Sequence, residues 1–287
     1  MTAAEAYAAR VDAVIAQRTR LRGPQPPGDL FAGLPPEHPL LTADPRRSIE
    51  PNLQIIAGYV EPDDVIVDVG GGAGRFSLPL ALRCREVINV DPSAAMLAAF
   101  EANARRAGIA NARAVRAGWP AADPPRGSVA LVNHVTYLTR DIVPFVEALA
   151  ASASRRVIVT VGNPPPPARN REVFRLVYGE ESERVPGHVE LVNVLWELGI
   201  QPDVRVLPDP TMLPVPAPSR EAAIAGALLA IRTHQWAFWP LDPELEARAR
   251  RIFDARFDEL FEQTADGYLP RWSSPGRDVL ITWETCA

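Results

Sequence analysis

Short apolar runs alternate with amphipathic segments between residues 65 and 161, and this alternation is the strongest pattern along the chain. Runs of this kind are typical of strands that are buried on both faces of a sheet. The pattern predicts strands at 65–69, 86–91, 112–116, 128–133 and 156–161, and helices at 75–82, 94–107 and 141–152. Strands and helices that alternate at this spacing predict a doubly wound α/β fold around a parallel sheet.

The segments on either side of this region are expected to be mainly helical, with proline-rich connectors between them. Before it, the sequence predicts a helix at 3–21, a connector at 23–45 and a second helix at 46–59. After it, the sequence predicts helices at 170–178, 188–198, 219–238 and 243–263, strands at 204–207 and 278–283, and a second connector at 208–218. These changes divide the chain into parts at 1–45, 46–161 and 162–287.

Composition and charge exclude several classes of function. The chain has 287 residues, which suffice for one large domain or two modest ones. Its net charge of −5 argues against a general nucleic-acid-binding protein, which usually carries a basic stripe. All 30 basic residues are arginine. The chain therefore lacks the lysine of a pyridoxal-phosphate Schiff base and the lysine of a phosphate-binding P-loop.

Cysteine usage and hydropathy predict a soluble, cytoplasmic protein. Cys84 and Cys286 have neither metal-ligand spacing nor the pattern of a disulfide framework, so both are expected to be free thiols. The scattered histidines offer no ligand spacing either, and no metal is expected. The sequence shows no signal-peptide pattern and no apolar run long enough to cross a membrane.

A glycine-rich turn between the predicted strand at 65–69 and the following helix carries the clearest functional signal. The turn and the acid before it read Asp68-Val69-Gly70-Gly71-Gly72-Ala73-Gly74. Glycine at such a turn lets a ligand approach backbone N–H groups without interference from Cβ atoms. Asp91 ends the next strand, where a carboxylate can accept hydrogen bonds from both hydroxyls of a ribose. Together these features predict a nucleoside-containing cofactor at the carboxyl ends of the strands.

The spacing of the glycines distinguishes between two classes of nucleoside cofactor. A dinucleotide-binding turn that starts at Gly70 needs a third glycine at position 75, where the chain has Arg75. An acid, one residue and then G-x-G-x-G is instead the first motif of the class I S-adenosylmethionine-dependent methyltransferases, and residues 68–74 resemble it. The ribose-binding acid of that family is matched by Asp91, in the run Asn89-Val90-Asp91-Pro92-Ser93-Ala94-Ala95-Met96-Leu97. The resemblance covers about residues 50–161.

The resemblance implies a Rossmann-like fold with a seven-stranded, mostly parallel sheet whose last strand is antiparallel. Residues 46–161 would form the core that binds S-adenosylmethionine, with S-adenosylhomocysteine as the product. The first helix would form an N-terminal arm, and the helices at about 219–263 would form a lid over the methyl acceptor.

The cofactor contacts of the family carry over to this chain residue by residue. Asp68 would orient the turn and the ammonium group of the cofactor, and Asp91 would hold its ribose. Asn133, directly after the fourth strand, would accept a hydrogen bond from the ammonium group. Trp119 follows the third strand, where the family often has an acid near the adenine, and it either stacks on the adenine or packs in the core. The expected cofactor set is Asp68, Gly70, Gly71, Gly72, Gly74, Asp91, Pro92, Met96, Trp119 and Asn133.

Candidate catalytic residues follow the fourth strand, at the end that faces the methyl donor in the family. Methyl transfer is an in-line displacement, so positioning is the protein's main task, and a base matters only for an acceptor that must lose a proton. Histidine titrates near neutrality, and His134 is the candidate base, with Tyr137 as a second candidate. The alternative is a hydrogen-bonded histidine that shapes the pocket wall. The segment Asn163-Pro164-Pro165-Pro166 resembles an N-P-P-aromatic motif, but it follows another strand and lacks the aromatic residue, so a rigid turn is expected there.

The expected function is methylation of a small-molecule acceptor on oxygen, nitrogen or carbon. Nucleic-acid and membrane partners are not expected, and the amphipathic first helix is compatible with a homodimer. Two alternatives stay open: a methyltransferase that acts on RNA or protein, and a protein that binds S-adenosylmethionine without catalysis. A nicotinamide-dependent oxidoreductase is a more distant third.

Overall fold

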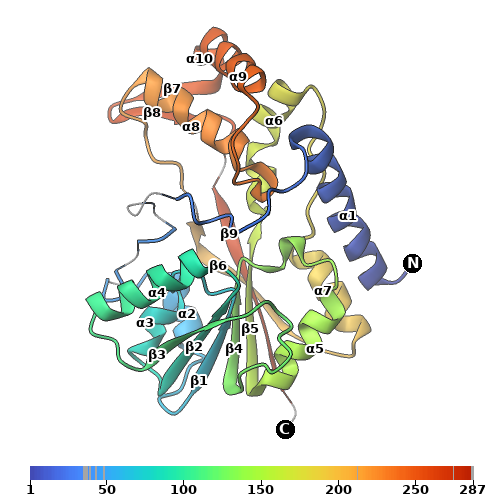
Figure 1. The fold of residues 1–287 in the computed structure, drawn as a ribbon, viewed down its shortest axis with the longest axis vertical. Helices are drawn as coiled ribbons and strands as arrows, with labels where there is room; N and C mark the ends of the chain where they lie inside the picture. Colours follow the sequence, from blue (N-terminus) through green and yellow to red (C-terminus); the bar gives the residue numbers. More distant parts are fainter. Residues whose placement is uncertain are drawn as a thin grey trace.

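The computed structural model describes residues 1–34, 38, 40–42, 44–47, 49–211, 213–273 and 275–285. At its centre lies a seven-stranded sheet in the order β3-β2-β1-β4-β5-β9-β6 (Figure 1). The strands are β1 (Val65–Val69), β2 (Glu86–Asp91), β3 (Ala112–Arg116), β4 (Gly127–Asn133), β5 (Ala153–Asn163), β6 (Asp203–Thr211) and β9 (Gly276–Glu284). β9 runs antiparallel to β5 and β6, whereas the other paired strands run parallel. The predicted seven-stranded, mostly parallel sheet with an antiparallel last strand is confirmed.

Helices cover both faces of the sheet, because alternate residues of each strand point to opposite sides. One layer holds α2 (Pro51–Ala57), α3 (Ser77–Ala81) and α4 (Ala94–Arg106), and the other holds α1 (Ala3–Arg22), α5 (Ile142–Ser152) and α7 (His188–Glu197). Ile66 of β1 packs in the first layer, and Val65 and Val67 pack in the second. Every residue of β1 is buried, which explains its near-continuous apolar sequence. Helices α2 and α3 are shorter than the sequence predicts.

The N-terminal helix α1 packs within its own chain. It begins with a capping box, in which Glu5 N–H donates to Thr2 Oγ1 and Thr2 N–H donates to Glu5 Oε2. The face that carries Tyr7, Val11 and Val14 is buried, as the periodicity predicts, and α1 lies against α7 and α5. Because the chain itself covers this face, the amphipathic pattern of α1 no longer argues for a homodimer.

A third apolar cluster lies beyond the carboxyl ends of the parallel strands, at the top of Figure 1, and forms the interior of a group of elements that we call the lid. The lid contains α6 (Arg171–Tyr178), α8 (Arg220–Arg232), α9 (Pro243–Ala255), α10 (Phe257–Leu260) and a hairpin of β7 (Phe261–Thr264) and β8 (Gly267–Pro270). Short 3₁₀ helices follow β4, β5 and α8, namely η1 (Thr136–Leu138), η2 (Pro166–Asn170) and η3 (His234–Trp236).

The lid differs from the purely helical lid that the sequence predicts. The helix expected at 243–263 is broken at Arg256 into α9 and α10, and the helical segment ends at Leu260, because Phe261 begins β7 and pairs with Pro270. The regular spacing of phenylalanines across this boundary imitates a helix. All of them are buried in the same cluster, where the rings of Phe257 and Phe261 stack 4.6 Å apart. Burial in one core, and not a shared helix, explains the spacing.

Two other boundaries also differ from the prediction. The helix expected at 219–238 ends at Arg232, and Gln235 and Trp236 then adopt left-handed φ angles of 54° and 56°. Strand β6 continues to Thr211, into the segment expected to be a connector. Both differences bring chain from the second half toward the carboxyl edge of the sheet.

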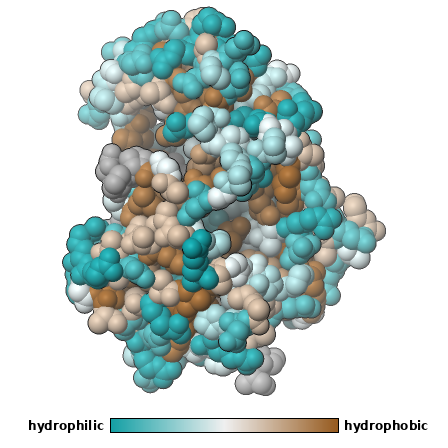
Figure 2. Space-filling model, viewed as in Figure 1, coloured by the Kyte–Doolittle hydropathy of each residue, from teal (hydrophilic) through white to brown (hydrophobic). Residues whose placement is uncertain are grey.

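Among the residues described, no helix is both long and apolar enough to span a membrane. Cys84 is buried and free, whereas Cys286 lies outside the described residues. Figure 2 shows hydrophobic surface in the middle of the face that Figure 1 presents, between the mostly hydrophilic outer end of the lid and the sheet.

Candidate active site

The glycine turn after β1 adopts a backbone that other residues tolerate poorly. Gly70, Gly72 and Gly74 have φ angles of 68°, 54° and 80°, in the left-handed region that favours glycine. A Cβ atom on Gly70 would lie 2.6 Å from Val135 Cγ2, and one on Gly74 would lie 2.6 Å from Leu78 Cγ. The turn is therefore packed tightly between the loop after β4 and helix α3.

Asp68 lies directly beneath this turn. It is 1% exposed, and neither carboxylate oxygen has a hydrogen-bond partner among the described residues. A Cβ atom on Gly71 would lie 2.1 Å from Asp68 Oδ2, so the backbone of the turn rests on the carboxylate. Burial raises the pKa of Asp68 to about 7; the nearby Ser77 hydroxyl opposes the rise, and the negative charge of Asp91 adds to it. A buried polar group without a partner marks a place that a ligand can complete.

Asp91 and Asn89 fix the turn from the neighbouring strand β2. Asp91 Oδ2 accepts from Gly72 N–H at 3.0 Å, and Asp91 Oδ1 accepts from Ser93 N–H at 2.8 Å. Burial raises the pKa of Asp91, and these two hydrogen bonds oppose the rise. Asn89 Nδ2 donates to the Gly72 carbonyl at 2.8 Å, whereas Asn89 Oδ1 is buried without a partner among the described residues. The sequence-based site omits Asn89, although a polar residue in a buried strand, in register with Asp68, is a signal that identifies it.

A second group of polar side chains follows β4, at the predicted catalytic residues. His134 has a left-handed φ of 58°, and its ring lies between two polar partners. Its Nδ1 lies 2.9 Å from Tyr137 Oη, and its Nε2 lies 3.4 Å from Asp278 Oδ1. Tyr137 is 1% exposed, and its Oη accepts from Gly162 N–H at 2.7 Å. This geometry suits Tyr137 to orient His134 and does not suit it to contact an acceptor.

The part of the chain that holds both groups matches a known family. Residues 66–155 match the family model of a methyltransferase domain. This match contains the glycine turn, Asp91 and His134, and the sheet has the strand order and the antiparallel strand described above. The chain carries a class I S-adenosylmethionine-dependent methyltransferase domain.

Solved structures share the fold of this methyltransferase domain. The YcgJ protein from Bacillus subtilis has a TM-score of 0.53 at 14% identity, over 82% of this chain and 98% of that one. A protein from Bacillus halodurans C-125 has a TM-score of 0.54 at 12% identity, over 82% of this chain and 97% of that one. At these identities the likeness shows the fold alone.

Curated relatives match over a shorter range. An uncharacterized protein of Haemophilus influenzae is 28% identical over 159 residues, which are 54% of this chain and 58% of that protein. The 23S rRNA (uracil(1939)-C(5))-methyltransferase RlmD of Aeromonas salmonicida is 36% identical over 110 residues, which are 32% of this chain and 25% of that protein. The chain spans less than two thirds of the length of either relative, so neither determines a substrate for this chain.

Trp119 and Asn133, both predicted cofactor contacts, have partners within the chain. Trp119 Nε1–H donates to the Phe145 carbonyl at 3.3 Å, and its ring packs against the apolar layer of α5. Asn133 Oδ1 accepts from Thr160 Oγ1–H at 2.7 Å, while Asn133 Nδ2 is buried without a partner among the described residues. Asn133 therefore offers an amide N–H to a ligand, and its Oδ1 keeps a second lone pair that can accept from an ammonium group.

Pro92 and Met96 flank Asp91 at the start of α4. Pro92 is exposed, whereas Met96 is buried and its Sδ lies 3.6 Å from a Cβ atom built on Gly72. Met96 thus packs under the glycine turn, while Pro92 faces outward. As cofactor contacts both remain predictions.

Asp29 joins the cofactor side of the domain, although the sequence gives no sign of it. Its carboxylate accepts from Ser93 Oγ–H at 2.9 Å and from Ala95 N–H at 3.0 Å, which ties the N-terminal connector to the start of α4. Phe31 of the same connector lies against the ring of Phe238, 5.2 Å away. Figure 1 shows this blue connector crossing between the lid and the sheet. A connector without periodicity carries no local signal of such contacts.

The remaining sequence motifs add no further group to the site. The segment 163–166 ends β5 and begins η2, a position compatible with the rigid turn expected there. In the part of the chain that the structure describes, no cluster of three or more His, Cys, Asp or Glu side chains is arranged to hold a metal ion.

Proposed function

We propose that the protein transfers a methyl group from S-adenosylmethionine to a small-molecule acceptor by in-line displacement. One observation carries the proposal. The Asp68 carboxylate is buried without a partner in the described chain beneath the glycine turn, and Asp91 stands at the edge of the same turn. A ligand that brings a positive charge and a ribose to these two acids fits this arrangement. S-adenosylmethionine, when bound, supplies a methyl group on a positively charged sulfur.

Three parts of the chain would hold this cofactor. Asp91, fixed by the N–H groups of Gly72 and Ser93, would accept from the ribose hydroxyls. The N–H groups of Gly70, Gly72 and Gly74 donate within the chain. The backbone N–H groups of the turn that would meet the carboxylate of the amino-acid end are therefore those of Gly71 and Ala73. Asp68 would supply negative charge near the ammonium group, and that positive charge favours the ionised form of Asp68. Pro92, Met96, Trp119 and Asn133 complete the proposed set.

The surroundings of His134 favour a small acceptor. The ring of Phe76 lies 6.2 Å from that of His134, and the ring of Trp236 stacks on Tyr137 at 4.9 Å. Apolar rings with a few polar groups among them are typical of sites for small molecules. The lid also stands over the carboxyl edge of the sheet, where it would limit the access of water. We propose oxygen, nitrogen or carbon as the atom that is methylated.

RNA is the second candidate acceptor, because several curated relatives are 23S rRNA methyltransferases. Those matches cover 25%, 31% and 33% of the relatives. The net charge of −5 opposes binding to a phosphate backbone. We therefore favour the small molecule, with no nucleic-acid or membrane partner.

The proposal also includes a cytoplasmic location, a cofactor-binding core at 46–161, and a lid within 162–287 after the N-terminal part at 1–45. A homodimer stays open, without support from α1. A protein that binds the cofactor without catalysis stays open as well, and turnover distinguishes it from an enzyme.

Calorimetric titration with S-adenosylmethionine and S-adenosylhomocysteine tests the proposal on three proteins. We expect micromolar binding to the wild type, about −8 kcal/mol. Asp91→Ala should lose about 2 kcal/mol or more of binding free energy, because hydrogen bonds to a charged group disappear. Asp63→Ala is the control, since Asp63 is exposed at the opposite end of β1, and its affinity should match the wild type.

Absence of binding to the wild type contradicts the proposal, and binding of NAD in its place would favour an oxidoreductase. Where the cofactor binds, a screen of small hydroxyl, amine and carbon acceptors beside RNA separates the candidates. Transfer to RNA alone would favour the second candidate, and cofactor binding without transfer to any acceptor would favour the inactive protein.

A further inference from the structure

Asp278 lies beside His134, although the two residues are far apart in the sequence. Because β9 is antiparallel, its first residues lie at the edge where β4 and β5 end, and Asp278 pairs with Gly162 of β5. Asp278 is 4% exposed, and its Oδ1 lies 3.4 Å from His134 Nε2. This distance is longer than that of a well-formed hydrogen bond. Both atoms therefore keep hydrogen-bonding capacity for a third group.

The hydroxyl of Tyr137 determines which nitrogen of His134 carries the hydrogen. Burial raises the pKa of Tyr137, so the hydroxyl keeps its proton. Its oxygen accepts from Gly162 N–H, and His134 Nδ1 is the other group within hydrogen-bonding distance among the described residues. A buried hydroxyl proton without an acceptor costs about 1–3 kcal/mol. Tyr137 thus donates to Nδ1, and neutral His134 carries its hydrogen on Nε2, toward Asp278.

Arg169 and Thr211 hold Asp278 from another side. Arg169 Nη2 donates to Thr211 Oγ1 at 3.4 Å, and Thr211 Oγ1 donates to Asp278 Oδ1 at 3.3 Å. Arg169 is 6% exposed, and burial lowers its pKa, while the negative charge of Asp278 opposes that change. A buried guanidinium needs a negative charge nearby. Asp278 supplies this charge and faces His134 as a carboxylate.

We infer that Asp278 accepts the proton of the methyl acceptor, and that His134 donates its Nε2–H to the acceptor atom. The inference rests on the proposed function and narrows it to acceptors that carry a hydroxyl group. An oxygen has two lone pairs, one to accept from Nε2–H and one to attack the methyl carbon. An amine nitrogen has a single lone pair, which the hydrogen bond would occupy, and a carbon acceptor offers none.

The proton and the electrons balance in this step. As the new carbon–oxygen bond forms, the carbon–sulfur bond breaks and its electron pair stays on sulfur. The hydroxyl proton passes to Asp278 Oδ1, from which it is released to water after turnover. A carboxylate is a weak base, so an acidic hydroxyl such as that of a phenol suits it. The His134 side chain is 27% exposed and that of Asp278 is 6% exposed. The acceptor hydroxyl therefore has to approach along the exposed edge of the His134 ring, beside which Asp278 Oδ1 lies 3.4 Å from Nε2.

Nitrogen NMR on the whole ¹⁵N-labelled chain tests the position of the hydrogen without an acceptor or turnover. Long-range ¹⁵N–¹H spectra distinguish a ring protonated on Nδ1 from one protonated on Nε2, and His134→Gln assigns the signal. We expect His134 of the wild type to carry its hydrogen on Nε2. In Tyr137→Phe we expect a mixture of the Nδ1–H and Nε2–H forms, because that variant lacks the hydroxyl that donates to Nδ1. A wild type protonated mainly on Nδ1 overturns the inference.

Asp278→Asn tests the proton acceptor, because asparagine keeps the size of the side chain but lacks the carboxylate. With catechol and simple phenols as acceptors, we expect kcat to fall about 10²–10⁴-fold. KM and the affinity for S-adenosylhomocysteine should stay within a few-fold of the wild type. Asp266→Asn, in the exposed turn between β7 and β8, is the matched control.

Undiminished kcat in Asp278→Asn overturns the inference, and so does a wild type that methylates amines or carbon acceptors but none of the phenols. Failure of the wild type to bind S-adenosylhomocysteine would instead contradict the proposed function. The NMR experiment on the free protein needs neither cofactor nor acceptor, so it distinguishes failure of the inference from failure of the proposed function.

Discussion

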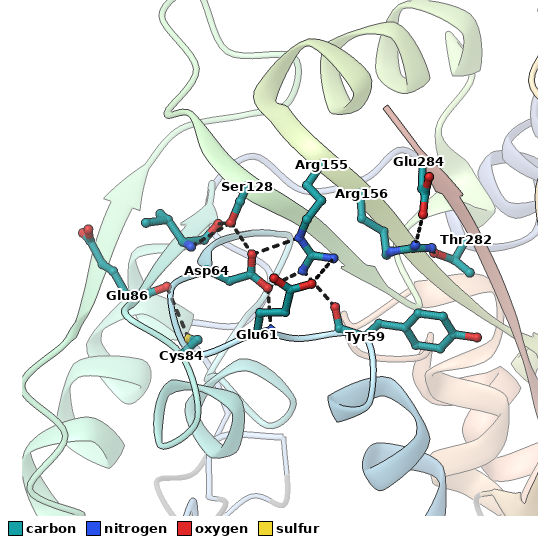
Figure 3. Close-up of polar contacts among 11 residues, drawn as sticks. Tyr59, Glu61, Asp64, Cys84, Glu86, Ser128, Arg155, Arg156, Thr282 and Glu284 are labelled. Carbon is teal, nitrogen blue, oxygen red and sulfur yellow. Dashed lines mark hydrogen bonds and ion pairs between the residues drawn. The ribbon is translucent and has the colours of Figure 1, made fainter. Parts of the chain in front are cut away.

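Asp64 and Asp68 lie near opposite ends of β1, and the chain surrounds them in opposite ways. Asp64 directly precedes the strand, at the amino edge of the sheet, and is 3% exposed. It accepts from Ser128 Oγ–H at 2.6 Å, from Glu61 N–H at 2.7 Å and from Arg155 Nε–H at 3.2 Å (Figure 3). Burial alone would raise its pKa, but Arg155 and the other donors hold the pKa of Asp64 below its ordinary value.

Asp68, at the carboxyl edge, is even more buried and accepts no hydrogen bond among the described residues. The Ser77 hydroxyl lowers its pKa, but burial outweighs that effect. Asn89 Oδ1 and Asn133 Nδ2, at the same edge, also lack partners there. A protein rarely leaves buried polar groups unpaired unless something else pairs with them. The difference between the two acids therefore separates a residue that holds the fold from residues that await a ligand.

Loss of the Asp64 carboxylate should give the largest change in stability, and it tests whether Asp64 holds the fold. Asp64→Ala leaves Arg155 without its buried acid and removes the acceptor of Ser128 Oγ–H. We expect the free energy of unfolding to fall by about 3 kcal/mol, as for other broken buried ion pairs. The affinity for S-adenosylhomocysteine should stay unchanged. Urea denaturation and calorimetry measure both, with Asp63→Ala as the neighbouring exposed control. A loss of stability no greater than in that control would mean that Asp64 is not a structural acid.

The pH dependence of stability sharpens the comparison, because the two pKa values are displaced in opposite directions. The folded-state pKa of Asp68 is about 7, against about 3.9 in an unfolded chain. Between these values the folded state binds the extra proton, so the contribution of Asp68 is present in acid and is lost as the pH rises toward 7. The contribution of Asp64, whose pKa is lowered, is present above about pH 4 and is lost in acid.

Without cofactor, we therefore expect Asp68→Asn to remove about 2 kcal/mol of the fall in unfolding free energy between about pH 5 and pH 7. Asp64→Asn should leave that interval unchanged and flatten the loss of stability below about pH 4. Urea denaturation at a series of pH values measures both slopes. Parallel curves for Asp68→Asn and the wild type would show that Asp68 is ionised throughout, against the environment described for it.

The difference between the surroundings of Asp64 and those of Asp68 was only partly predictable from the sequence. Strand β1, the glycine turn and Asp91 lie close together in the sequence, so the local sequence pattern predicts all three. The order of the strands follows from the family resemblance. Asp68 is visible as an acid in an apolar run, but its lack of partners depends on β2 and α3. Asn89 has a signal of the same kind, which the sequence-based site did not use.

Contacts between distant segments account for what the sequence did not predict. Asp278 and Asp29 reach the site from the last strand and from the N-terminal connector, and neither has a local pattern. The role of Tyr137 depends on the N–H of Gly162, which only the pairing of strands brings near. The lid hairpin at Phe261 was missed because phenylalanines buried in one core repeated at helical spacing across a helix end.

Substitution of Asp29 should have the smallest effect on stability, and it tests the comparison most directly. Asp29 lies at the cofactor edge of the sheet, as Asp68 does, but donors from the chain hydrogen-bond to it, as they do to Asp64. It accepts from Ser93 Oγ–H and Ala95 N–H, and these and other donors outweigh burial and lower its pKa. Hydrogen-bond partners within the chain would mark Asp29 as an acid that holds the fold and does not bind the ligand. In that case Asp29→Ala should lower the free energy of unfolding by about 1 kcal/mol, as loss of a helix cap does. The affinity for S-adenosylhomocysteine should then stay within about two-fold, which is under 0.5 kcal/mol.

Ser219→Ala is the matched control for this variant, since Ser219 caps α8 through Ala222 N–H, and α8 belongs to the lid. Both variants should lose similar stability, with and without S-adenosylhomocysteine. A large loss of affinity in Asp29→Ala alone would mean that an acid with partners in the chain also serves the ligand. Unpaired groups would then mark only part of the site, and the N-terminal connector would belong to it.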